Sequence, residues 1–133
     1  MGIRAAVEIS KTTMRERAVK FAADHADDAS EAADRQTFWN DFFSVFEVKR
    51  RQVAAFEELA ERASTANRGW IDLLYPGEMA VEHKSLGGDL NAAMLQLLDY
   101  LTSLSRAVHP WLLVVCDFQR FAWHNLETGD RGE

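Results

Sequence analysis

The stretch that decides the fold is W-I-D-L-L-Y-P-G-E-M-A-V-E-H-K-S, residues 70–85. Two short apolar runs meet at Pro76-Gly77, a pair typical of a tight turn, so the stretch predicts a β-hairpin. Both runs carry charged side chains where a buried strand normally has none. Asp72 interrupts the first run, and Glu82 follows the second.

The hairpin predicts that three charged side chains converge. Residues two apart on a strand share a face, so Glu82 and Lys84 point the same way and His83 points the other way. Antiparallel pairing of the two runs brings Asp72 to the same end. Two carboxylates close together repel each other unless a positive group lies between them. A hard divalent cation such as Mg²⁺, which takes oxygen ligands, would supply that charge.

This arrangement favours hydrolysis of a phosphodiester. A bound Mg²⁺ polarises a phosphoryl oxygen and lowers the pKa of a bound water. A lysine beside it can hold the attacking water or offset charge on the phosphate in the transition state. Asp72, followed by Glu-x-Lys at Glu82 and Lys84, is the core of the PD-(D/E)XK nuclease arrangement. The alternative is a half-exposed hairpin with a cross-strand ion pair.

Length and composition indicate one globular domain. The chain has 133 residues, of which 47% are apolar and 27% charged, and this suits a single hydrophobic core. The single cysteine, Cys116, excludes a disulfide framework within the chain and suits a reducing cytoplasm. No apolar run is long enough to cross a membrane, and no signal-peptide pattern is present, so a cytoplasmic protein without a membrane partner is expected.

The formal net charge of −6 argues against independent DNA binding, because free-standing nucleic-acid binders usually have a basic surface. Attachment to a larger protein that grips the DNA would remove this objection. Lys49-Arg50-Arg51 is the one basic run, and either contact with a phosphate backbone or a solvated connector explains it.

Helices are predicted before the hairpin. Thr13 is expected to cap the first helix. The acidic stretch 24–34 is expected to be a solvated loop or helix end rather than a metal site. Residues 36–48 predict a helix buried through an aromatic stripe, and residues 52–63 predict a further helix.

A helix and two strands are predicted after the hairpin. Asp89 is a good N-cap for a helix with an apolar face over 90–104. The continuous apolar run 111–116 is typical of a central strand buried on both faces. Residues 121–126 alternate as a further strand, and residues 127–133 are expected to form a polar tail.

These elements predict an α+β or α/β fold, with N-terminal helices packed on a small mixed sheet and a crossover helix, as in PD-(D/E)XK nucleases. The chain, 1–133, is expected to be one domain with a helical part near 12–64 and a sheet core near 65–128. Glu57 could supply a further metal oxygen, and Gln96 could hold a substrate phosphate or a water. Most glutamates on a helix of this kind are solvated, and Gln96 could equally be a solvated helix residue.

Several blocks of the chain resemble the N-terminal region of MmeI-type restriction–modification enzymes, in which a DNA endonuclease is fused to an adenine methyltransferase. They cover most of the sequence, in order. The blocks are F-W-N-D-F-F-S-V-F (38–46), R-R-Q-V-A-A-F-E-E (50–58), R-G-W-I-D-L-L-Y-P-G (68–77), E-H-K-S (82–85), Q-L-L-D-Y (96–100) and P-W-L-L-V-V-C-D-F-Q-R-F (110–121).

The resemblance implies a Mg²⁺-dependent PD-(D/E)XK endonuclease domain that acts on double-stranded DNA in a prokaryotic cytoplasm. Asp72 and Glu82 match the metal-binding acids, and Lys84 matches the catalytic lysine. Glu57 and Gln96 match weaker accessory positions. Methyltransferase and target-recognition domains are implied further along the same polypeptide. S-adenosylmethionine would bind only there, because this chain has no G-x-G-type loop or Asn/Asp-Pro-Pro-Tyr motif.

Two departures from the family pattern leave other functions open. The turn after Lys84 is S-L-G-G, without a basic residue, and the net charge is acidic. The main alternative is a non-catalytic nuclease-fold module that contacts DNA or partner domains, within a DNA methyltransferase or a phage-defence protein. A third possibility is cleavage of another nucleic acid in such a defence system.

Overall fold

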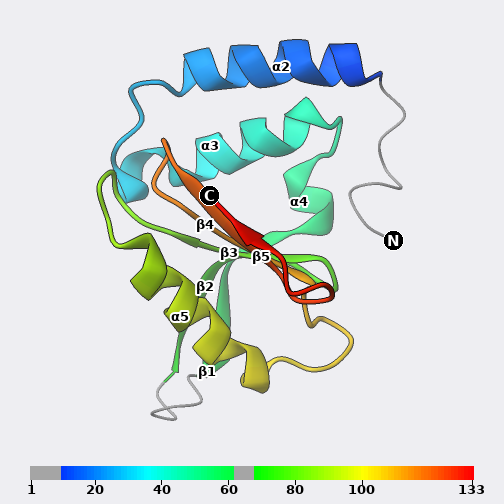
Figure 1. Ribbon diagram of the computed structural model, residues 1–133, viewed down its shortest axis with the longest axis vertical. Coiled ribbons are helices and arrows are strands. Elements are labelled where there is room, and N and C mark those ends of the chain that lie inside the picture. The colour runs from blue at the N-terminus through cyan, green and yellow to red at the C-terminus, as the bar shows by residue number, and fades with distance from the viewer. Residues whose placement is uncertain (1–9, 62–67) are drawn as a thin grey trace.

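A six-stranded sheet with the strand order β1-β2-β3-β4-β5-β6 forms the centre of the molecule (Figure 1). The computed structural model describes residues 10–61 and 68–133. The helices are α2 (Lys11–Asp24), α3 (Glu31–Val45), α4 (Arg50–Val53), α5 (Leu90–Tyr100) and the 3₁₀ helix η1 (Leu101–Ser103). The strands are β1 (Ala55–Glu61), β2 (Arg68–Tyr75), β3 (Met79–His83), β4 (Leu112–Cys116), β5 (Phe121–Asn125) and β6 (Arg131–Gly132).

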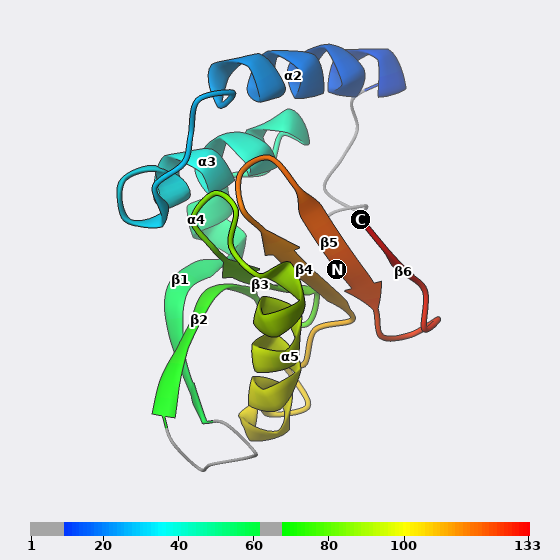
Figure 2. The same ribbon diagram turned by 60° about the vertical axis from the view of Figure 1, so that its left-hand side comes forward.

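The sheet is mixed, as the sequence predicts. Strands β3 and β4 are parallel, and all other neighbours are antiparallel. Helix α5 lies between β3 and β4 in sequence and covers one face of the sheet, so it is the predicted crossover helix (Figure 2). The α+β class is therefore confirmed. Within the part of the chain that the structure describes, none of the helices has the length and hydrophobicity of a membrane span.

The Pro76-Gly77 turn joins β2 and β3, as predicted. The Glu78 N–H donates to the Tyr75 carbonyl at 3.0 Å, which closes the turn. Gly77 has a φ of 76°, a value that a type II turn requires at its third residue and that glycine adopts without steric cost. The turn chemistry thus fixes the register of the hairpin that carries the charged residues.

Two hydrophobic clusters fill opposite faces of the sheet. An aromatic cluster lies under α3 and includes the fully buried Phe38, Trp39 and Phe43. A mostly aliphatic cluster lies under α5 and includes Leu97 and Leu113. Helix α2 lies over α3, away from the sheet (Figure 1). Burial of both faces explains why the central strands are apolar almost throughout.

Three segments differ from the sequence-based prediction. The helix predicted over 52–63 is confirmed only at residues 52–53, which end α4, and is wrong from residue 55 to residue 61. Residues 55–61 pair with β2, and this tertiary pairing overrides their helix propensity. The last two residues of that prediction lie outside the described residues. Helix α2 is capped by Ser10, whose Oγ accepts the Thr13 N–H at 3.1 Å. The predicted polar tail contains the short strand β6, which pairs with β5.

Strands β1 and β2 change faces together halfway along their length. Phe56 and its partner Leu73 pack with the aromatic cluster, whereas Ala60 and Ile71 pack with the cluster under α5. Strict alternation would place Phe56 and Ala60 on one face. Glu57 lies between them with a φ of 57°, which is uncommon for a residue with a side chain. The strand pair is therefore bent at the position of Glu57.

Candidate active site

The strands β2 and β3 diverge at the predicted site. Their pairing stops at Leu73–Val81, although β2 continues to Arg68 along β1 and β3 continues to His83 along β4. The backbone N–H of His83 donates to Asp72 Oδ2 at 2.8 Å. The Asp72 carboxylate thus satisfies a donor that continued pairing of the two strands would have engaged. It lies at the opening between the strands.

Arg35 of α3 holds the Asp72 carboxylate from the aromatic side of the sheet. Its Nη1 lies 3.0 Å from Asp72 Oδ1, and its Nη2 lies 3.0 Å from Glu57 Oε1. The Arg35 side chain is 13% exposed and that of Asp72 14%, so their ion pair is largely shielded from water. One guanidinium therefore connects carboxylates on the neighbouring strands β1 and β2.

Glu82 lies across the opening on β3 and is buried without a donor. The residue is 2% exposed, and neither carboxylate oxygen has a hydrogen-bond partner within the described part of the chain. Burial and the neighbouring Asp72 carboxylate raise the pKa of Glu82 well above its usual range, while the charge of Lys84 acts in the opposite direction. Without a cation, these surroundings therefore favour the protonated form of Glu82.

Lys84 is half-buried directly after β3 and is positioned by its backbone and its aliphatic stem. Its N–H donates to the Cys116 carbonyl of the neighbouring strand at 2.8 Å. A Cβ placed on Gly88 would lie 2.6 Å from the Lys84 Cβ, so only a glycine lets this loop lie against the lysine. The charge of Lys84 acts to lower the pKa of Glu82, against the larger effect of burial.

Asp117 fixes the loop that follows Lys84. It is fully buried, and its carboxylate accepts the N–H groups of Gly87 (3.2 Å) and Arg120 (2.8 Å) and the Arg120 Nε–H (3.0 Å). Arg120 also donates from Nη2 to the Gly88 carbonyl at 3.0 Å. Although burial opposes ionisation, these donors lower the pKa of Asp117. Sequence reasoning predicted only a turn at these residues. The signal for this role was an acid directly after a buried strand, with an arginine three residues later.

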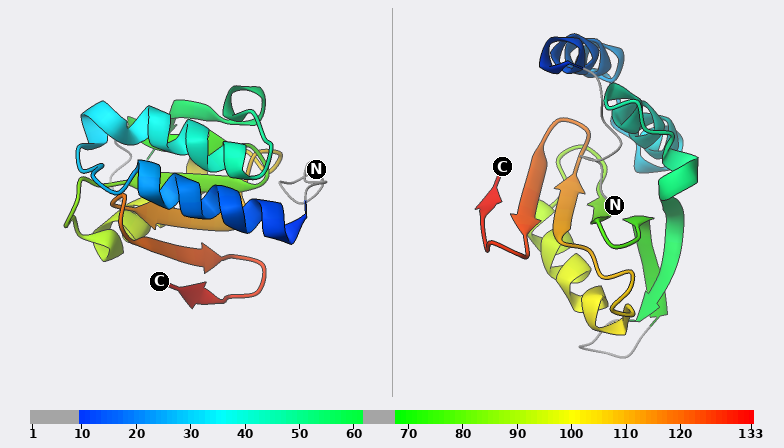
Figure 3. Two further views of the ribbon diagram at one scale, coloured as in Figure 1. Left: turned by 90° about the horizontal axis from the view of Figure 1, so that it is seen from above. Right: turned by 90° about the vertical axis from the view of Figure 1, so that its right-hand side faces the viewer.

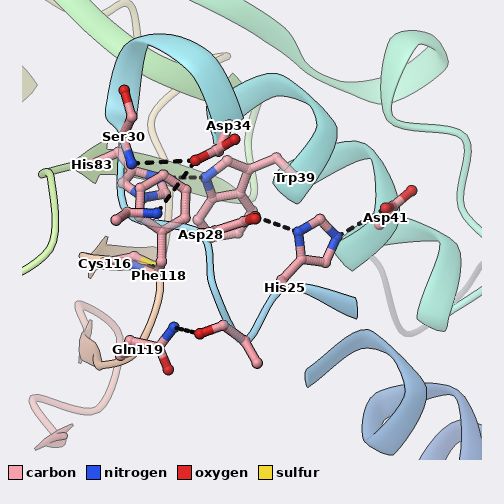
Figure 4. Close-up of polar contacts among 12 residues, drawn as sticks. His25, Asp28, Ser30, Asp34, Trp39, Asp41, His83, Cys116, Phe118 and Gln119 are labelled. Carbon is pink, nitrogen blue, oxygen red and sulfur yellow. Dashed lines mark hydrogen bonds and ion pairs between the residues drawn. The ribbon is translucent and has the colours of Figure 1, made fainter. Parts of the chain in front are cut away.

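His83 supports the opening from the aromatic side, as its predicted orientation requires. The Trp39 Nε1–H donates to His83 Nδ1 at 2.9 Å, and the Phe118 ring centroid lies 4.2 Å from that of His83 (Figure 4). Burial lowers the pKa of His83 to about 4, so the ring is neutral at physiological pH. It is thus a packed residue of the core rather than a base at the site.

The other two predicted site residues, Glu57 and Gln96, form no hydrogen bond with the two acids in the described structure. Glu57 reaches the site through Arg35, and 62% of its side chain is exposed. Gln96 is half-buried on α5, and no hydrogen bond in the described structure connects it to Asp72, Glu82 or Lys84. The structure therefore brings together the two acids and the lysine, with Glu57 linked to them by an ion pair.

A second group of polar residues lies where the acidic stretch meets α3. His25 is bonded to Asp28 through Nδ1 and to Asp41 through Nε2, the latter at 2.9 Å (Figure 4). Burial opposes protonation of His25, but these two carboxylates raise its pKa overall. The group therefore ties the end of α2 to α3.

The arrangement of acids limits how a metal ion could be held. Across the described residues, no group of three or more His, Cys, Asp or Glu side chains could hold a metal ion. Asp72 and Glu82 form a pair, which suits Mg²⁺, since that ion often takes one or two carboxylates and completes its shell with water or substrate oxygens. The unpaired, buried oxygens of Glu82 fit such a ligand role.

The comparison with known families supports one assignment. A family model described as "MmeI, N-terminal domain" matches residues 9–133, and this range includes Asp72, Glu82 and Lys84. No curated protein and no solved structure gives a significant match.

Proposed function

The chain belongs to the MmeI N-terminal domain family of restriction–modification enzymes, and on that premise we propose that it is a Mg²⁺-dependent DNA endonuclease domain. The substrate would be double-stranded DNA. Methyltransferase and target-recognition domains of the same polypeptide would hold the DNA and bind S-adenosylmethionine, in a prokaryotic cytoplasm. A DNA grip supplied by those domains accommodates the net charge of −6.

The observation that carries this proposal is the pair of acids at the β2–β3 opening. Asp72 is ion-paired to Arg35, whereas the buried oxygens of Glu82 accept no hydrogen bond within the described residues. An unsatisfied buried carboxyl costs about 1–3 kcal/mol of stability. A divalent cation between the two acids would displace the proton of Glu82 and remove that cost.

The residues have distinct proposed roles. Asp72 and Glu82 would hold Mg²⁺, which when bound polarises a phosphoryl oxygen and lowers the pKa of a water molecule. Lys84 would orient the attacking water and offset the charge that develops on the phosphate. Glu57 is proposed as an accessory acid, and Gln96 as a residue that holds a substrate phosphate or a water.

Plasmid nicking tests this function. In the presence of Mg²⁺, we expect Lys84→Ala in the full-length protein to cleave roughly 10²- to 10³-fold more slowly than the wild type, because the charge that stabilises the transition state is removed. Lys11→Ala changes an exposed lysine at the start of α2, outside the site, and is the matched control. Equal cleavage by the wild type and Lys84→Ala would contradict the proposal.

A second candidate function is a non-catalytic nuclease-fold module that contacts DNA or partner domains. The acidic net charge and the absence of a basic residue in the loop 85–88 favour it. Titration with Mn²⁺ separates the two functions. Binding that is lost in Asp72→Asn and Glu82→Gln supports the nuclease, and no binding by the wild type supports the module.

A further inference from the structure

Trp70 is an exposed aromatic residue on β2, next to a buried residue of the same strand. Its exposed fraction is 57%, whereas Ile71, the next residue of β2, is fully buried. Tryptophan is normally among the more buried residue types, so an indole left open to solvent is a candidate for contact with another molecule. Its position relative to Asp72 indicates which molecule.

Trp70 and Arg68 lie on the side of β2 that faces away from α5. Ile71 packs in the cluster under α5, and a side chain at Gly69 would collide with the Tyr100 hydroxyl of α5. Because side chains alternate along a strand, Trp70 and Arg68 point to the opposite side. This is the side from which Arg35 reaches Asp72.

This part of the sheet is not covered by the helices that pack on the rest of it. The paired strands β1 and β2 extend beyond α3 and α4, and α5 lies against their other face (Figures 2 and 3). Side chains two apart on a strand are about 6.6–6.8 Å apart along it. Trp70 is thus one such step from Asp72, and Arg68 is one step further.

We propose that Trp70 and Arg68 form a contact surface for the nucleic-acid strand that enters the Asp72–Glu82 site, an inference that rests on the proposed function. The indole of Trp70 packs against a sugar or base, and Arg68 pairs with a phosphate. Glu57 lies beside this surface, but its carboxylate is paired with Arg35, which reduces its repulsion of a polyanion. The surface supplies cationic and aromatic groups that the loop after Lys84 lacks.

DNA binding by single variants tests this surface. Fluorescence anisotropy with a labelled short duplex at about 50 mM salt detects weak, largely electrostatic binding. We expect Trp70→Ala to weaken binding roughly tenfold, as loss of an aromatic contact does, and Trp70→Phe to retain most of the affinity. Trp123→Ala is the matched control, because Trp123 is 38% exposed on β5, away from Asp72.

Arg68 is tested by the salt dependence of binding. Removal of one phosphate contact in Arg68→Gln should reduce the slope of log affinity against log salt concentration by about 1. Equal affinity of Trp70→Ala and Trp123→Ala would overturn the surface, and so would an absence of DNA binding by the wild-type chain. Circular dichroism of each variant verifies its fold.

Mn²⁺ titration of the same proteins keeps this inference separate from the proposed function. Trp70→Ala should bind Mn²⁺ like the wild type, because Trp70 is not a proposed ligand. If the wild type binds no Mn²⁺ but Trp70→Ala still weakens DNA binding, the nuclease assignment fails and the surface stands. If Mn²⁺ binds and Trp70→Ala binds DNA like the wild type, only the surface is overturned.

Discussion

Two buried acids at the same end of neighbouring parallel strands have opposite surroundings. Asp117, just after β4, accepts hydrogen bonds from Gly87, Gln119 and Arg120, and its pKa is lowered. Glu82, near the end of β3, accepts none within the described structure, and its pKa is raised by burial and by Asp72. Both side chains are buried carboxyl groups, but only Asp117 has hydrogen-bond donors around it.

The difference shows how a structural carboxylate is distinguished from a candidate functional one. Donors stabilise Asp117 in its charged form, so Asp117 contributes to stability by holding the loop after Lys84. Glu82 contributes nothing comparable, since its burial disfavours the charge it would carry. A carboxyl group that is buried without donors, at a cost in stability, and that lies next to a second acid is the pattern expected at a cation-binding site.

The largest effect is expected at the structural acid. Asp117→Ala should lower the free energy of unfolding by about 3–5 kcal/mol, because it leaves buried donors and Arg120 without their partner. Urea denaturation measures this value. Asp130→Ala, at an exposed acid, should stay within about 0.5 kcal/mol of the wild type. A loss of unfolding free energy at Asp117 no larger than that at Asp130 would show that the hydrogen bonds of Asp117 do not stabilise the protein, and the proposed difference between Asp117 and Glu82 would fail.

A smaller effect of opposite sign is expected at Glu82 in the presence of EDTA. The folded-state pKa of Glu82 lies above its ordinary value of 4.5, so wild-type stability falls as the pH rises from that value through the raised pKa. Glu82→Gln has no proton to lose. It should be about 1–3 kcal/mol more stable than the wild type at pH 8 and close to it at pH 4.

Urea denaturation of Glu82→Gln and wild type at both pH values measures this difference. Glu127→Gln, at an exposed glutamate, is the control and should show no gain at either pH. A Glu82→Gln variant that is no more stable than the wild type at pH 8 would mean that burial of the Glu82 carboxyl does not lower the stability of the protein.

The smallest effect is expected at Glu57, an acid that has a partner but is exposed. Glu57→Gln removes an ion pair with Arg35 at a side chain that is 62% exposed. The change in unfolding free energy should be below about 1 kcal/mol, as for other solvent-screened pairs. Thermal denaturation at low and high salt measures it, and a large, salt-independent loss would show that Glu57 belongs with the buried acids.

Local sequence signals predicted the hairpin, its turn, the crossover helix and the central strand. Each depends on residues close together in the chain, such as Pro76-Gly77 or the cap Asp89. The partners of the acids were not predictable in this way. Arg35 and Asp72 are far apart in the sequence, and residues 55–61 have a helical pattern that only pairing with β2 overrides. Contacts between residues far apart in the sequence therefore determine the strand at 55–61 and the partner of Asp72, and local propensity does not reveal such contacts.

Where β2 and β3 diverge, one amide is protected by a side chain instead of a neighbouring strand. The His83 N–H is bonded to Asp72 Oδ2, whereas the Ala80 and Val81 positions pair with strands on both sides. Deuterium exchange at His83 therefore reports whether the Asp72 carboxylate stays in place. If a cation drew Asp72 toward Glu82, this one amide would exchange faster while Ala80 and Val81 remained slow.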